Sequence, residues 1–288
     1  MNAKTPRPTP SAKAPVEAPS AVEAPSKEAP SKDPVAEPAP PARILAVAGQ
    51  KGGAGKSTVA ICIAAEAVAR GRRVLLVDAD PQATARTWGA VAAEAGQPSP
   101  TIVAMGATMH KPGQLSQAAE SFDLVVIDCP GKLGDIQRSA LLVADLALLP
   151  CGPSAADAWA LSSSIELIHE AQTFRPALQA AVVITRKQGR TSLGQAAREV
   201  LAEAGLPVLA AELGYRIAFQ EALGAGRGVS SYAPKDPATA ELRALYEELW
   251  PTPGARQKGD AKTKKKDSAK RGAVKTPARA REGARHGS

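Results

Sequence analysis

Residues 49–58 have the spacing of a phosphate-binding loop: they read Gly-Gln-Lys-Gly-Gly-Ala-Gly-Lys-Ser-Thr and lie between two apolar runs. Glycines let backbone N–H groups close around phosphate oxygens, and the N-terminus of a following helix adds unpaired N–H groups and partial positive charge. In such a loop Lys56 would reach the β- and γ-phosphates, and the Ser57 hydroxyl would be a Mg²⁺ ligand. The segment therefore predicts a site for a nucleoside triphosphate with Mg²⁺.

This loop departs from the ordinary pattern G-x-x-x-x-G-K-[ST], because Gln50 stands where that pattern has glycine and a second lysine, Lys51, precedes the glycine pair. The form K-G-G-x-G-K-[ST] resembles the deviant Walker A box of the ParA/MinD ATPases of the SIMIBI class. The resemblance implies ATP as the nucleotide and a homodimer that forms on ATP binding, with Lys51 acting in trans on the partner's phosphates. It implies nucleotide contacts from Gly52, Gly53, Ala54, Gly55, Lys56, Ser57 and Thr58.

Three aspartates follow apolar runs and so fall at the same predicted sheet edge as the loop. Asp128 ends Val-Val-Ile-Asp, where a carboxylate can hold Mg²⁺ directly or through water, although it could instead cap the next helix. Asp78 and Asp80 belong to Asp-Ala-Asp-Pro-Gln, which matches the family's D-x-D-P-Q motif. The resemblance implies that Asp78 orients the attacking water, while Asp80 supports Mg²⁺ or serves as a turn residue before Pro81.

The likeness extends beyond these motifs, over about residues 43–250, and is closest to the short plasmid- and chromosome-partition ParA proteins. Residues 123–161 carry much of it, including Pro130-Gly131 after Asp128 and Pro153-Ser154 after the next strand. Thr185 and Arg186 lie where the family often contacts the nucleotide base, so the resemblance implies that both bind the cofactor.

Both ends of the chain differ in composition from the middle. Residues 1–42 hold 11 of the 25 prolines, and residues 252–288 carry 12 Lys/Arg against 3 Asp/Glu, a net charge of +9. Neither can bury enough apolar surface to offset its ordering entropy, so we expect disordered tails at 1–42 and 252–288 around an ATPase domain at 43–251. The basic tail suits nonspecific contact with nucleic acid, or serves only for solubility.

Between the tails, apolar runs alternate with helical segments. This alternation predicts an α/β fold: a three-layer, doubly wound, mostly parallel sheet of the P-loop NTPase type. We expect strands at residues 44–48, 74–77, 101–104, 123–128, 146–149, 181–185 and 208–211. We expect helices at residues 58–70, 84–95, 114–121, 135–143, 155–174, 192–204, 216–223 and 238–250.

Together these features favour a partner-stimulated segregation ATPase. The resemblance implies that Mg²⁺-dependent hydrolysis is weak, that the ATP-bound dimer binds nucleoid DNA without sequence preference, and that a ParB-like partner stimulates hydrolysis and release. The cargo would be a plasmid, a chromosome origin or a protein assembly. The family binds DNA through basic residues on one face, and the candidates here are Arg186, Lys187, Arg190, Arg216 and Arg227, although each could be an ordinary surface cation. No apolar segment fits a signal peptide or a membrane span, so we expect a cytoplasmic, nucleoid-associated protein.

Three other classes compete with this interpretation. A membrane-bound regulator of the MinD type would need an amphipathic helix after Trp250, which the sequence lacks. An iron–sulfur carrier would need cysteines placed to bridge a cluster, and Cys62, Cys129 and Cys151 have no such spacing. A protein that only compacts DNA through its tails would bind DNA without needing Lys56.

Overall fold

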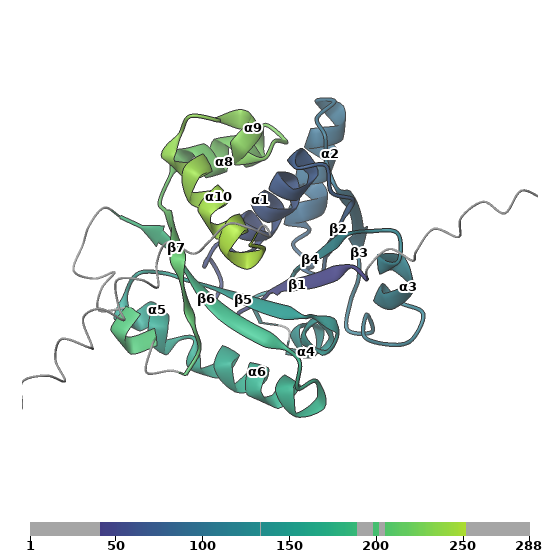
Figure 1. Cartoon of the computed structure of the whole chain (residues 1–288), viewed down its shortest axis with the longest axis vertical. Coiled ribbons are helices and arrows are strands. Elements are labelled where there is room, and N and C mark those ends of the chain that lie inside the picture. The colour runs from purple at the N-terminus through teal and green to yellow at the C-terminus, as the bar shows by residue number, and fades with distance from the viewer. Residues whose placement is uncertain (1–40, 133, 189–197, 202–204, 252–288) are drawn as a thin grey trace, which may run out of the picture. The chain divides into compact units, whose positions relative to one another are not determined.

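The structure, a computed structural model, describes residues 41–132, 134–188, 198–201 and 205–251 (Figure 1). The predicted tails, apart from residues 41 and 42, lie outside these residues. So do Arg190 and most of the helix expected at residues 192–204.

Seven strands form one sheet in the order β3-β2-β4-β1-β5-β6-β7, and every pairing is parallel. Because β1 is central and the chain runs outward from it in both directions, the strand order reverses beside β1, which is where such sheets bind ligands. The strands are β1 Arg43–Val47, β2 Val74–Asp78, β3 Thr101–Ala104, β4 Leu124–Asp128, β5 Leu146–Cys151, β6 Gln179–Lys187 and β7 Val208–Gly214.

Helices cover both faces of the sheet and make the three layers that the sequence predicts (Figure 1). Alternate strand residues pack on opposite sides: Leu45 and Val47 face α1, α2, α8, α9 and α10, whereas Ala46 and Ala48 face α3 to α6. The helices are α1 Lys56–Ala69, α2 Thr84–Glu94, α3 Leu115–Ala119, α4 Gly134–Val143, α5 Ala155–Trp159, α6 Ser162–Phe174, α8 Ile217–Gly224, α9 Val229–Tyr232 and α10 Pro237–Leu249.

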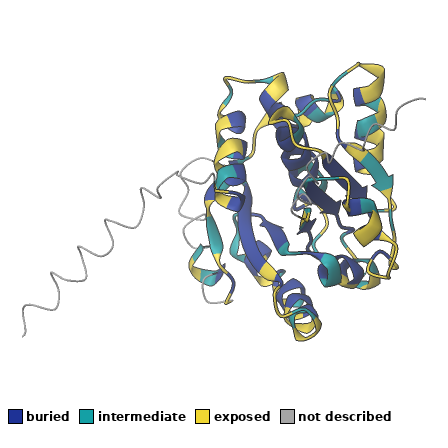
Figure 2. Cartoon of the chain, turned by 45° about the vertical axis from the view of Figure 1, so that its right-hand side comes forward, coloured by how far each residue is buried: buried dark blue, intermediate teal, exposed yellow. Residues whose placement is uncertain are grey.

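The central strands are buried on both faces, as Figure 2 shows by their dark blue colour. All five residues of β2 and of β4 are buried, which explains why these strands read as continuous apolar runs. The doubly wound α/β fold is therefore confirmed. Among the described residues, no helix combines the length and the apolar character needed to cross a bilayer.

The prediction of a single continuous helix at residues 155–174 is wrong. Residues 155–174 form two helices: α5 begins after the Ser154 capping box and ends at Trp159, and α6 begins at Ser162. The Ser162 hydroxyl donates to the Trp159 carbonyl at 2.9 Å, a local bond that competes with a continuous helix. The short helix α9 was not expected, and β6 and β7 run longer than predicted.

Candidate nucleotide site at the carboxyl edge of the sheet

The glycine loop joins β1 to α1 and has a backbone that depends on glycine. Gly49, Gly53 and Gly55 have φ values of 137°, 71° and 90°, in the left-handed region that side chains with a Cβ rarely adopt. The loop borders a cleft of about 810 Å³ whose lining includes Gly52, Gly53, Gly55, Lys56, Ser57, Thr58, Asp80, Gly131, Lys132, Thr185, Arg186 and Tyr215. The structure thus brings most of the predicted nucleotide-binding residues to one cavity.

Distant side chains hold the backbone of this loop. Gln137 of α4 accepts from the Gly49 N–H at 3.4 Å, and Ser164 of α6 accepts from the Gln50 N–H at 3.0 Å. The Thr185 hydroxyl is 3.0 Å from the Ala54 carbonyl and 3.2 Å from the Cys151 carbonyl. Three elements far apart in the sequence therefore support the loop, and Thr185 takes part as one of its anchors.

Lys56 is buried at the start of α1, with 7% of its surface exposed. Its Nζ donates to the Lys51 carbonyl at 2.9 Å. Burial lowers the pKa of Lys56, and the negative charges of Asp128 and Asp80 offset only part of that effect. A desolvated ammonium beside a cleft would gain strongly from phosphate oxygens, so this environment supports the predicted role of Lys56.

Asp128 is fully buried at the end of β4, and neither of its carboxylate oxygens has a hydrogen-bond partner among the described residues. Burial raises the pKa of Asp128 to about 7, and the charges of Asp78 and Asp80 add to the rise, while the Ser57 hydroxyl and the Lys56 ammonium offset part of it. A buried carboxylate without partners is costly unless a cation accompanies it. The donor set of Ser57, Asp128 and Asp80 therefore fits Mg²⁺, a hard ion that prefers oxygen ligands.

Asp78 ends β2 and is committed to the backbone of the following turn. One oxygen accepts from the Arg86 N–H at 2.9 Å and the other from the Asp80 N–H at 3.2 Å, and the Arg86 guanidinium lies 3.5 Å away. Asp80 accepts from the Gln82 N–H at 2.9 Å, as a turn residue does. The turn also holds Ala83 at φ 58°, an uncommon conformation for alanine. A role for Asp78 in orienting water stays a prediction.

Lys51, for which the family resemblance implies contact with a partner's phosphates, is paired within its own chain. Its Nζ contacts Asp157 Oδ1 in α5, and the Arg186 guanidinium lies 3.8 Å from the same oxygen. Sequence reasoning did not single out Asp157, Gln137 or Ser164. The spacing Ser154-x-x-Asp157 is readable as a capping box, but nothing local links Asp157 to a lysine 106 residues away.

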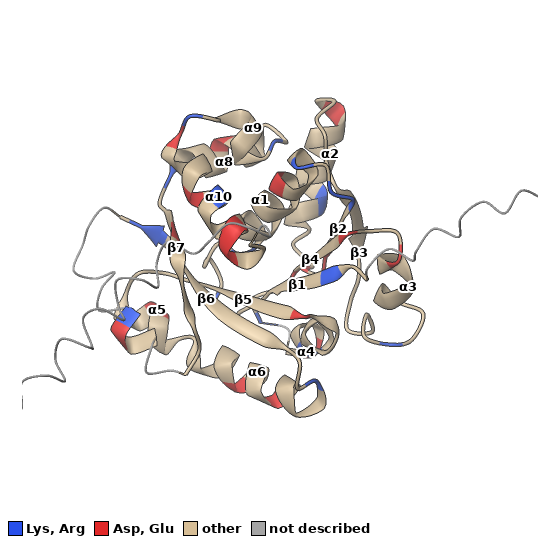
Figure 3. Cartoon of the chain, viewed as in Figure 1, with Lys and Arg blue, Asp and Glu red and all other residues tan. Residues whose placement is uncertain are grey.

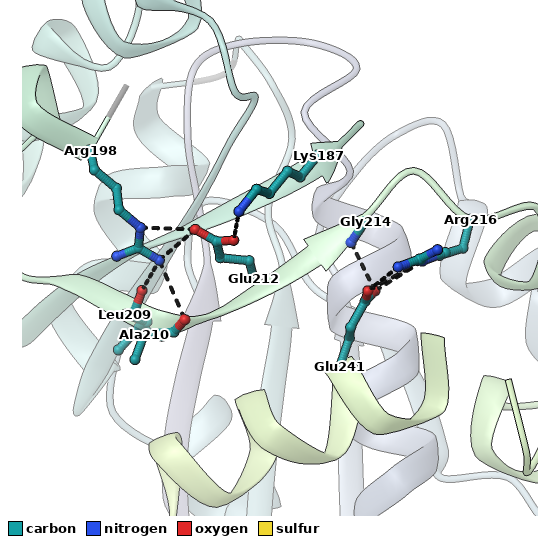
Figure 4. Close-up of polar contacts among 8 residues, drawn as sticks. All are labelled: Lys187, Arg198, Leu209, Ala210, Glu212, Gly214, Arg216 and Glu241. Atoms are coloured by element: carbon teal, nitrogen blue, oxygen red, sulfur yellow. Dashed lines mark hydrogen bonds and ion pairs between the residues drawn. The ribbon is translucent and has the colours of Figure 1, made fainter. Parts of the chain in front are cut away.

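Most of the core cations expected to contact DNA have partners inside the protein. Figure 4 shows Lys187 and Arg198 on either side of Glu212, and Arg216 against Glu241 of α10. Arg227 donates to the Ser231 carbonyl, and Arg190 lies outside the described residues. Along the ribbon in Figure 3, Lys and Arg positions alternate with Asp and Glu positions. The described part of the folded domain therefore has fewer unpaired cations available to bind DNA than its arginine and lysine content indicates.

The three cysteines are free and buried, and burial raises the pKa of Cys62 and of Cys151 to about 12. Thiols in the core cannot bridge a cluster to a second subunit without a change in structure, which argues against an iron–sulfur carrier.

Comparison with known proteins agrees with this geometry. The family model described as the CobQ/CobB/MinD/ParA nucleotide binding domain matches residues 45–229. The maintenance of carboxysome distribution protein A of Halothiobacillus neapolitanus is 33% identical over 213 residues, covering 72% of this chain and 96% of that protein. The chromosome-partitioning ATPase Soj of Thermus thermophilus is 31% identical over 239 residues, covering 72% and 95%.

The septum site-determining protein MinD of Pyrococcus horikoshii, solved with Mg-ADP, has the same fold, with a TM-score of 0.59, 20% identity and coverage of 75% of this chain and 99% of that chain. ATP and Mg²⁺ are consistent with that structure and with the phosphate loop and buried carboxylate found here. The chain belongs to the CobQ/CobB/MinD/ParA family of nucleotide-binding domains, with ParA and MinD ATPases among its relatives.

Proposed function

We propose that this protein is a ParA-type segregation ATPase: ATP closes a homodimer, the dimer binds DNA without sequence preference, and a ParB-like partner stimulates hydrolysis and release. The observation that carries the proposal is the pairing of a phosphate loop with an orphaned carboxylate. Lys56 and Asp128 are both desolvated, their opposite charges offset only part of that burial, and neither carboxylate oxygen of Asp128 has a hydrogen-bond partner among the described residues. Mg²⁺ and a triphosphate would supply the remaining partners. A second lysine, Lys51, stands at the entrance to the same loop.

Each residue would contribute positioning or charge neutralisation, the two requirements of phosphoryl transfer. The amides of the loop and Lys56 would hold the phosphates, and Ser57 with Asp128 would hold Mg²⁺, which neutralises developing charge when bound. Asp78 would orient the attacking water, with Asp80 supporting Mg²⁺ or the turn, and Arg186 would contact the nucleotide. Lys51 would reach the phosphates of the partner subunit.

The cargo has two candidates. The relative Soj is a chromosome-partitioning ATPase, which favours DNA as the cargo. The relative from H. neapolitanus is named for the maintenance of carboxysome distribution, which favours a protein assembly. Both relatives cover the same share of this chain, so the ATPase domain fits either cargo. A deletion strain would separate them: loss of plasmids or chromosomes supports the first, and clustering of a protein assembly supports the second.

Retention of the full chain on immobilised duplex DNA tests the proposal directly. With Mg-ATP we expect at least tenfold more retention than with Mg-ADP or no nucleotide. Lys56→Ala should lose this gain, because the triphosphate loses its main cation. Asp78→Ala should retain the ATP-bound dimer for longer. Equal retention with and without nucleotide would identify a passive polycation and reject the proposal.

Deleting residues 252–288 tests where DNA is contacted. The segment carries 12 Lys/Arg, whereas Lys187 and Arg216 of the core are already paired with carboxylates. Because each phosphate contact steepens the dependence of affinity on salt, the deletion should flatten the slope of log K against log salt by several units. The matched control, Lys187→Ala with Arg216→Ala in the full chain, should change the slope by less than about one unit. A larger change in the control than in the deletion would place DNA on the core.

A further inference from the structure

The Lys51–Asp157 contact joins the loop to α5, and neither residue lines the cleft. We infer that Asp157 is a positioning residue that holds Lys51 within its own subunit when no triphosphate is bound, and so sets the ATP concentration at which two subunits pair. The inference rests on the proposed function, because it concerns the lysine that the dimer needs.

The position of the Asp157 carboxylate does not depend on Lys51. Its Oδ2 accepts from the Ser154 hydroxyl at 2.6 Å and from the Ser154 N–H at 3.3 Å, while the Asp157 N–H donates back to Ser154 Oγ at 3.1 Å. This reciprocal cap fixes one oxygen and leaves Oδ1 for cations. The Asp157 carboxylate is therefore held in place by Ser154, and the Lys51 side chain binds to it.

The surroundings make room for this carboxylate and keep it charged. A Cβ on Gly152 would fall 2.4 Å from Asp157 Oδ2, so a side chain at that position would displace the acid. Burial would raise the pKa of Asp157, but the hydrogen bonds from Lys51 and Ser154 outweigh burial and lower it. Asp157 therefore remains an anion, with Lys51 and Arg186 as its two cations.

Phosphate binding would loosen this arrangement from inside the loop. In the structure, the Lys56 ammonium rests on the Lys51 carbonyl at 2.9 Å. Lys56 would turn from that carbonyl toward the oxygens of a bound triphosphate, which would leave the backbone at residue 51 less restrained. The triphosphate also competes with Asp157 for Arg186, which lines the cleft. A ligand shifts such an equilibrium by its difference in affinity for the two states, and here Asp157 stabilises the unpaired one.

Sedimentation of the full chain with Mg²⁺ and the non-hydrolysed analogue AMP-PNP tests the inference. Asp157→Asn should reach half-maximal dimer at a three- to tenfold lower analogue concentration than the unaltered chain, and Asp157→Glu should return toward it. Ser154→Ala keeps the acid but removes the hydroxyl that fixes Oδ2, so it should shift the analogue requirement in the same direction by less than Asp157→Asn does. Adding Lys51→Ala to Asp157→Asn should abolish the gain. An unchanged or higher analogue requirement for Asp157→Asn overturns the inference.

Amine labelling read by mass spectrometry gives a second test, which requires no dimer. Without nucleotide, the labelling rate of Lys51 relative to exposed Lys111 should rise at least threefold in Asp157→Asn, and equal relative rates overturn the inference. If that variant does not fold, a sodium chloride titration of the unaltered chain replaces it. The relative rate should then rise with salt, and a constant rate rejects the contact. Failure of the unaltered chain to dimerise rejects the proposed function instead, while labelling still tests Asp157.

Discussion

At the two ends of strand β4, two aspartates five residues apart have opposite environments. Asp123, just before the strand, accepts three hydrogen bonds from Arg73, two from its guanidinium and one from its backbone N–H, and these contacts lower its pKa. Asp128, its last residue, has no hydrogen-bond partner in the described structure, and burial raises its pKa to about 7. One carboxylate has its hydrogen-bond partners within the fold, whereas the other has none among the described residues, and nearby groups offset only part of the effect of its burial.

The same contrast extends along both edges of the sheet. At the amino edge, Asp145 accepts from the Ile44 N–H at 2.9 Å and pairs with Arg175 at 2.7 Å. At the carboxyl edge, Lys56 is buried against a backbone carbonyl, and Ala83 is held at positive φ. A carboxylate without hydrogen bonds, Asp128, and a strained residue, Ala83, are found where the ligand is expected, and such features are typical of a binding site supported by a stable scaffold.

The largest expected effect comes from Asp128→Asn. The raised pKa means that the native chain holds a proton that the unfolded chain releases between about pH 4 and 7. Stability from this group is therefore present below pH 4 and lost as pH rises through 7. At pH 8 without Mg²⁺, the free energy of unfolding should be roughly 2–4 kcal/mol higher in Asp128→Asn than in the unaltered chain. Urea unfolding at pH 5 and pH 8 measures this difference.

With Mg²⁺ and nucleotide present, the advantage of Asp128→Asn should disappear, because the cation supplies the missing partner. Equal unfolding free energies for the two chains at pH 8 in the absence of Mg²⁺ would remove the contrast between the two ends of β4.

A smaller change of opposite sign is expected from Asp123→Asn. Its lowered pKa contributes stability above about pH 4, which is lost as pH falls through the folded-state value. Since the pair with Arg73 is exposed, the loss at pH 7 should be below about 1 kcal/mol. ATP hydrolysis should be unaffected, and urea unfolding with a hydrolysis assay checks both. A marked loss of hydrolysis in Asp123→Asn would show that the amino edge of the sheet contributes to activity as well as to stability.

The smallest effect should come from Ala83→Gly in the turn after Asp80. Glycine relieves the left-handed conformation, but it also raises the entropy of the unfolded chain, so the net gain in unfolding free energy should be about 0.5 kcal/mol. Thermal unfolding measures it, with exposed Ala90 of α2 replaced by glycine as the matched control. The control should lose stability, because glycine weakens a helix interior. A loss of similar size at Ala83 would argue against strain at this turn.

The sequence predicts the parts of this molecule that depend on local pattern. Continuous apolar runs placed β2 and β4, and the glycine spacing placed the loop whose left-handed residues the structure describes. It could not reveal the partners of Lys51 and of Gly49, because Asp157 and Gln137 are 106 and 88 residues away and reach the loop only through the sheet topology. The break between α5 and α6 was missed because the helical periodicity continues across it, although the Ser162 hydroxyl bonds the Trp159 carbonyl there.

The exposed position of Trp159 gives this protein an internal optical probe. Of its three tryptophans, Trp88 and Trp250 are 3% and 7% exposed, whereas Trp159, two residues beyond Asp157 in α5, is 68% exposed. Its emission should therefore dominate the long-wavelength side of the spectrum. Rapid mixing with nucleotide could follow this indole in real time, and an unlabelled sample would report when α5 changes its surroundings.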